Sequence, residues 1–143
     1  MTITVDSPAH IASHRVVLAR SRHAPEVARK ITARWLAACE APFGAAADAI
    51  LIVSELVTNT FRHTSGPCTL TLTVCGSELD IGVADTSAEV PQARAVTCVD
   101  ERGGFGLTML GELGARVSVA PTPEGKTVHA ALDLGPGVPD LRE

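Results

Sequence analysis

The chain has 143 residues, of which 45% are hydrophobic, and its formal net charge is -4. This length suits one domain with a substantial core, and an acidic balance without a basic run argues against direct binding of nucleic acid. No uninterrupted apolar stretch approaches the roughly 18 residues of a membrane span, and the N-terminus shows no signal-peptide pattern, so we expect a cytoplasmic protein without membrane contact. The four cysteines have no CxxC spacing, which excludes the common zinc and redox motifs.

The first half of the chain predicts one strand and two helices. Residues 1–14 form an N-terminal segment, either a short strand or an ordered tail, and residues 15–19 predict a strand. Pro25 suits a first helical turn, and apolar residues then recur at helical spacing to about Glu40. Residues 41–44 interrupt this helix, and a second one is expected over residues 45–63.

The second helix carries the most informative pattern. Glu55, Asn59 and His63 recur at four-residue steps and therefore share one face. The opposite side predicts a buried stripe, made of Ile50, Val53, Val57 and Thr60. A packed back and a polar front suit the wall of a binding site, although a solvated polar face explains this segment equally well when it is taken alone.

The second half of the chain predicts mostly strands. We expect two strands, at 68–74 and 79–84, joined by a turn at Gly76. A loop at 88–104 and a short helix at 105–113 follow. The chain then ends with a hairpin of strands at 116–120 and 127–134 and a loose tail at 135–143. This order predicts an α/β (α+β) two-layer sandwich over residues 15–134. Its mixed, mostly antiparallel sheet is expected to carry three helices on one face.

Two further motifs follow the polar helix. Asp85 stands where a buried strand ends, as a cap for the next turn or as an acceptor for an N–H of a ligand. Residues 101–107 then place three glycines at the start of a helix, where bare backbone N–H groups favour a phosphate, although glycines also simply permit a turn. The segment is neither a P-loop, because no Lys-Ser/Thr pair follows, nor a dinucleotide fingerprint, because no strand precedes it.

In this order, the motifs resemble the GHKL ATP-binding superfamily, whose fold is the Bergerat fold. Residues 55–59 are similar to its N box, residues 85–87 to a shortened first glycine box, residues 104–107 to its second glycine box and residues 125–128 to the Gly-Lys-Thr entering the last strand. Within the superfamily, residues 101–109 resemble the lid of the anti-sigma regulatory factors, also called switch-protein serine kinases. The resemblance covers residues 15–134.

The resemblance implies a role for each matching residue. Asn59 is similar to the Mg²⁺ ligand, Glu55 to the general base, Asp85 to the adenine anchor and Arg102 to a lid arginine that reaches the terminal phosphate. The remaining nucleotide contacts that it implies are Ser87, Gly103, Gly104, Gly106, Leu107 and Thr127. His63 matches a common histidine to which we attach no role. Ala88 and Phe105 depart from the usual pattern, so ATP binding is a firmer expectation than catalysis.

The function implied is that of an ATP- and Mg²⁺-dependent anti-sigma factor. Such a protein holds a sigma factor inactive and phosphorylates a serine of an anti-anti-sigma protein, which adds negative charge and breaks their contact. Relatives of this kind are often homodimers. Three alternatives stay open: a non-catalytic, nucleotide-gated binding module, a two-layer domain without a ligand, and the ATP domain of a histidine kinase. The last is disfavoured because no dimerisation helix precedes Arg15.

Overall fold

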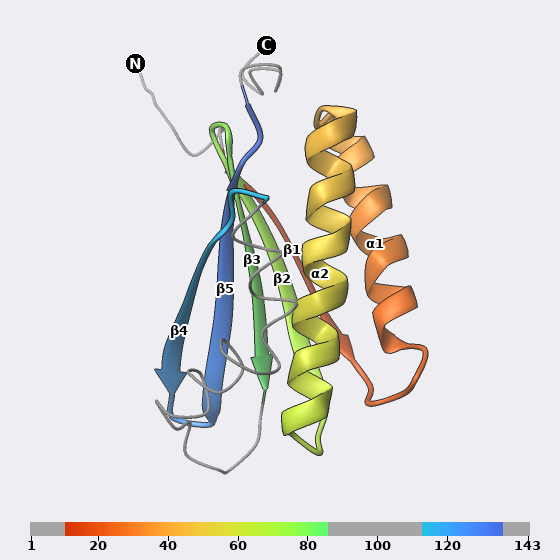
Figure 1. Ribbon diagram of the computed structural model, residues 1–143, viewed down its shortest axis with the longest axis vertical. Helices are drawn as coiled ribbons and strands as arrows, with labels where there is room; N and C mark the ends of the chain where they lie inside the picture. Colours follow the sequence, from red (N-terminus) through yellow and green to blue (C-terminus); the bar gives the residue numbers. More distant parts are fainter. Residues whose placement is uncertain (1–10, 86–112, 136–143) are drawn as a thin grey trace.

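The computed structural model describes residues 11–85 and 113–135 (Figure 1). These residues form two helices and five strands, in the order β1 (Ile11–Leu18), α1 (Ala24–Ala38), α2 (Phe43–His63), β2 (Cys68–Cys75), β3 (Glu78–Asp85), β4 (Arg116–Thr122) and β5 (Gly125–Asp133). The two helices lie side by side on one face of the sheet, so the predicted two-layer α/β sandwich is confirmed (Figure 1).

The five strands form one sheet in the order β1-β2-β3-β5-β4. Each neighbouring pair is antiparallel, so the prediction of a mixed sheet is wrong for the described strands. Strand β1 begins at Ile11, and the predicted N-terminal segment therefore gives its last residues to the sheet. The described residues hold two helices instead of the predicted three, and the segment expected to form the third lies outside them except for Leu113.

The core lies between the sheet and the helices because the strands alternate in burial. In β2 the buried residues are Cys68, Leu70, Leu72 and Val74, while the threonines between them are only partly buried. Helix α2 faces the sheet with Ile52, Val53, Leu56 and Val57, all almost completely buried. Burial of such side chains is the main favourable term in folding. Two predicted members of the stripe, Val53 and Val57, are fully buried, whereas Ile50 is only partly buried.

Helix α2 is also the one described helix with the length and apolar character of a membrane span. It has 21 residues and a mean hydropathy of 1.2. Polar residues interrupt its apolar ones, so it contains no uninterrupted apolar run of that length. These same properties suit the central helix of a folded domain, and α2 packs against α1 and the sheet, with seven buried residues.

The C-terminal end of α2 is held by Arg20, which lies in the connection between β1 and α1. Nη2 of Arg20 donates to the carbonyl oxygen of Phe61 at 2.8 Å, and its guanidinium lies 5.7 Å from the centre of the Phe61 ring. A cation at this position satisfies carbonyls that have no partner within the helix and complements the helix dipole. The hydroxyl of Thr64 donates to the carbonyl of Thr60 at 2.8 Å, which fixes the last turn. The helix end that borders the functional site is therefore anchored.

Candidate functional site

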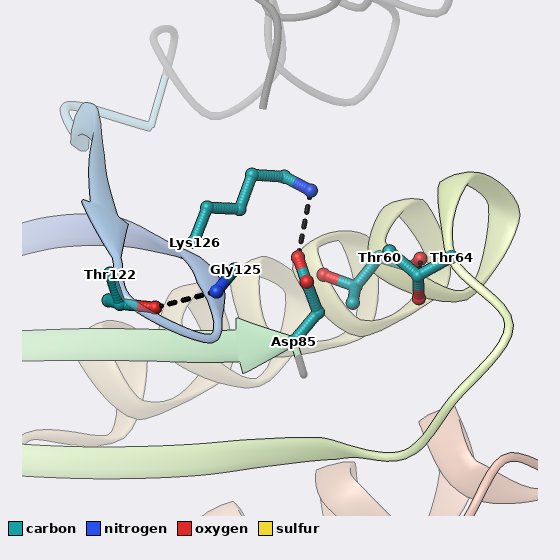
Figure 2. Close-up of polar contacts among 6 residues, drawn as sticks. All are labelled: Thr60, Thr64, Asp85, Thr122, Gly125 and Lys126. Atoms are coloured by element: carbon teal, nitrogen blue, oxygen red, sulfur yellow. Dashed lines mark hydrogen bonds and ion pairs between the residues drawn. The ribbon is translucent and has the colours of Figure 1, made fainter. Parts of the chain in front are cut away.

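Asp85, one of the predicted site residues that the structure describes, lies at one end of the sandwich. Strand β3 ends there with Asp85, strand β5 begins there with Gly125 and Lys126, and the last turns of α2 lie beside them (Figures 1 and 2). A tight turn at residues 123–124 joins β4 to β5, and the N–H of Gly125 donates to the hydroxyl of Thr122 at 3.0 Å. This turn fixes the register of β5 against β4, and the pairing of β5 with β3 on its other edge sets Lys126 opposite Asp85.

Asp85 is the buried charge of this site. Its side chain is 3% exposed, and its Oδ2 lies 2.8 Å from Nζ of Lys126 (Figure 2). The two residues are direct partners in the antiparallel register, which places their side chains on the same face of the sheet. The ion pair with Lys126 offsets part of the cost of burying this carboxylate. Its position at the end of the strand suits an acceptor for a ligand N–H.

The electrostatic effect of Asp85 extends to the neighbouring strand. Cys68 is its register partner on β2. Burial, and secondarily the charge of Asp85, raises the pKa of the Cys68 thiol to about 11. This thiol is therefore protonated at neutral pH and is a packing residue, because the thiolate is the reactive form. Cys39 and Cys75 are free thiols as well.

The polar face of α2 supplies the second part of the site. Glu55 and Asn59 are both half-buried, one turn apart. Within the described residues, Nδ2 of Asn59 is buried without a hydrogen-bond partner, which is costly unless another group completes the site. Among the residues that the structure describes, the amide oxygen of Asn59 accepts one long hydrogen bond, of 3.5 Å, from Arg62. Amide and carboxylate oxygens are suitable ligands for Mg²⁺, so the residues present fit this ion.

The described residues contain no group of three or more histidine, cysteine and acidic side chains that would hold a metal alone.

His63 ends α2 and is the third residue of the predicted polar face. Its pKa is lowered by burial of the ring, then by the charge of Arg62 and finally by that of Lys126. The imidazole is therefore neutral at pH 7. The Lys126 side chain extends toward Asp85 near the C-terminal end of α2 (Figure 2).

Thr127 does not face the site, which corrects its predicted role. Its register partner on β3 is Ala84, one residue before Asp85, and successive side chains point to opposite faces. A methyl group added to Gly82 on the outer face would lie 3.5 Å from Cγ2 of Thr127, so the threonine packs on that outer face. The residue that does face Asp85 is Lys126, the lysine of the Gly-Lys-Thr sequence, for which the motif resemblance implied no role.

The other predicted site residues lie outside the described ranges. These are Ser87, Arg102, Gly103, Gly104, Gly106 and Leu107. Their roles stay predictions. Among the described site residues, the structure brings Lys126 to Asp85, with Thr60 and Thr64 of α2 nearby (Figure 2), and it places Asn59 and Glu55 on α2 as well.

A buried acceptor at a strand end and a polar helix face that suits Mg²⁺ together indicate a nucleotide-binding domain. Comparison with family models agrees: residues 17–132 match the histidine kinase-like ATPase domain. The chain therefore belongs to this family, which is of the GHKL type and binds ATP, usually with Mg²⁺. No curated protein gives a significant match to the chain.

Proposed function

We propose that the chain is a cytoplasmic, ATP-dependent anti-sigma factor with serine/threonine protein kinase activity. It holds a sigma factor inactive and phosphorylates an anti-anti-sigma protein, and the two partners exchange according to that phosphorylation. The observation that carries the nucleotide part is the buried Asp85 carboxylate at the end of β3, next to the helix that bears Asn59 and Glu55. The partner-switching part rests on the motif resemblance over residues 15–134.

In this proposal each residue has one task. Asp85 accepts a hydrogen bond from the exocyclic amine of adenine, and the amide oxygen of Asn59 binds Mg²⁺. Glu55 accepts the proton of the serine hydroxyl as it attacks, a role that contributes typically 10²–10⁴-fold to a rate. ATP supplies the phosphoryl group, and Mg²⁺ neutralises charge on its oxygens. Arg102 and the glycines at 103, 104 and 106 are the predicted phosphate contacts.

The decisive experiment incubates the full chain with γ-labelled ATP and candidate antagonist proteins encoded in the same genome. The wild type should transfer label to one antagonist. Glu55→Gln keeps the shape of the side chain and removes the base. This variant should bind ATP normally, and its rate of phosphate transfer should fall by a factor of about a hundred or more. Asp48→Asn is the matched control, because Asp48 lies on the same helix and is also half-buried.

The outcomes separate two classes of function. Equal transfer by wild type and Glu55→Gln contradicts the role of Glu55. ATP binding without transfer to any antagonist contradicts the kinase and leaves the non-catalytic, nucleotide-gated binding module, whose partner affinity would then be compared with ATP, with ADP and without nucleotide.

A further inference from the structure

Lys126 occupies a position that the proposed roles do not use. It stands opposite Asp85 in the register of β3 and β5, on the same face of the sheet, and its Nζ lies 2.8 Å from Oδ2 (Figure 2). The lysine side chain is 21% exposed and the aspartate side chain 3%. The accessible part of this ion pair is therefore the lysine, and a ligand that reaches Asp85 from solvent meets the ammonium group.

Such a ligand can either displace the lysine or bind beside it. Displacement takes the ammonium from a carboxylate that is almost fully buried, and separating a buried ion pair is strongly unfavourable. Binding beside it avoids this cost, because an ammonium has three donors and a carboxylate has about four acceptor positions. One hydrogen bond between the two groups leaves the lysine with donors for a ligand. The energetics favour a ligand that uses the pair intact.

We infer that Lys126 is a base-contacting residue that selects adenine over bases that lack an amine beside an unprotonated ring nitrogen. Asp85 accepts from the exocyclic amine, and the Lys126 ammonium donates to a ring nitrogen next to that amine. The inference rests on the proposed nucleotide binding and adds a second, charged contact to it.

Adenine fits because its amine is flanked by unprotonated ring nitrogens, N1 and N7. The Asp85 carboxylate and the Lys126 ammonium, held 2.8 Å apart, therefore face the amine of adenine and its adjacent ring nitrogen, respectively. Asp85 alone recognises only an N–H group, which every amino-substituted base offers. The pair recognises an amine together with an adjacent unprotonated ring nitrogen, which adenine and cytosine both present, and a base that presents only acceptors at this edge would set an oxygen against the carboxylate.

The test measures binding by titration calorimetry with the full chain, Mg²⁺ and three nucleotides: ATP, 1-deaza-ATP and 7-deaza-ATP. In each deaza analogue a C–H group replaces one ring nitrogen, which removes one acceptor and keeps the amine. The wild type should bind one of the two analogues about tenfold to a hundredfold more weakly than ATP, as expected for loss of a hydrogen bond to a charged group.

Lys126→Met should lose a similar factor for ATP and should show no additional loss with that same analogue. Lys30→Met is the matched control, since Lys30 is a strongly exposed lysine on α1 paired with Glu26, and it should bind all three nucleotides like the wild type.

Three results would overturn the inference. Equal or tighter ATP binding by Lys126→Met would mean that the lysine only neutralises or blocks Asp85. Equal affinity of the wild type for ATP and both analogues would mean that no ring nitrogen is contacted, and this measurement needs no variant to fold. A loss with the analogue that is as large in Lys126→Met as in the wild type would place the contact on another residue. Absence of ATP binding by the wild type would instead contradict the proposed function itself.

Discussion

At the scale of single residues, the ion pair between Asp85 and Lys126 is more easily explained by function than by stability. Buried ion pairs cost desolvation energy, and apolar residues of similar size often stabilise a protein as well or better. The neighbours of Asp85 on β3 are Leu79, Ile81 and Val83, which shows that the same face accepts apolar side chains. A carboxylate at the strand end, paired with a lysine, is suited to accept a hydrogen bond from a ligand.

Asp85→Asn should weaken ATP binding about tenfold to a hundredfold. The substitution keeps the size of the side chain but replaces one acceptor oxygen with a donor that faces the donor on adenine, and a hydrogen bond to a charged group is worth about 1.5–3 kcal/mol. Calorimetry with Mg·ATP measures the change. Asp80→Asn is the control, because Asp80 lies on the same strand but pairs with His129 on the outer face of the sheet. Wild-type affinity in Asp85→Asn would refute the adenine assignment.

His63 should report on the charges around the end of α2. Burial and the charges of Arg62 and Lys126 lower its pKa in the folded state. Because the unfolded state then binds the proton first, stability should decrease as the pH falls through the ordinary histidine value toward the lower folded one. An NMR titration of the ring should give a pKa below 6.5, higher in Arg62→Met. Replacement of His63 by Gln should flatten the pH dependence of stability in this window, and an unchanged slope would show that another group causes it.

At the scale of elements, the end of α1 stores strain at one residue. Glu40 has φ 60°, in the left-handed region, while its N–H donates to Ala37 and that of Ala41 to Leu36, as in a Schellman motif. A residue with a Cβ pays about 1–2 kcal/mol in this conformation, whereas glycine does not.

Glu40→Gly should therefore stabilise the fold, by up to about 1 kcal/mol after the greater flexibility of glycine in the unfolded chain is subtracted. Urea unfolding followed by circular dichroism measures this change. Glu40→Ala removes the carboxylate but keeps the Cβ, so it should show no such gain. A gain in the alanine variant equal to that in glycine would assign the effect to charge instead of backbone strain.

The sequence predicted the elements whose patterns are strong. The alternation of Leu70, Leu72 and Val74 with threonines located β2 to within a residue, and the four-residue recurrence of Glu55, Asn59 and His63 located the polar face of α2. The early start of β1 was not predicted, because Ile11–Leu18 is an edge strand with exposed apolar residues and no clear alternation. Pro121 seemed to end β4, yet an edge strand tolerates it.

The roles of Thr127 and Lys126 required the structure. The final hairpin was expected to have a loop from Pro121 to Lys126, whereas the observed turn comprises only residues 123 and 124. A shift of one residue in a strand reverses the face of every side chain. Sequence patterns identified the hairpin but not its register, and the register alone places Lys126 beside Asp85.

At the scale of the whole molecule, the site joins the two layers of the sandwich. Asp85 and Lys126 belong to the sheet, while Asn59 and Glu55 belong to α2, whose other side is part of the core. A nucleotide bound here contacts both layers at one end only. The turn between β2 and β3, at Gly76, lies at the opposite end of the sheet (Figure 1).

This asymmetry gives a prediction for hydrogen exchange. With Mg·ATP at about a hundred times its Kd, binding stabilises the folded state by about 2.7 kcal/mol. Amides that exchange only through global unfolding should slow accordingly, and local openings at the C-terminal turns of α2, the end of β3 and the start of β5 should slow by up to the same factor. The turn around Gly76 opens without disturbing the site, so its exchange should not change. Asp85→Asn at the same nucleotide concentration is the control and should show a smaller effect. Equal protection at both ends, or none at the end of β3, would show that the nucleotide does not bind between the two layers.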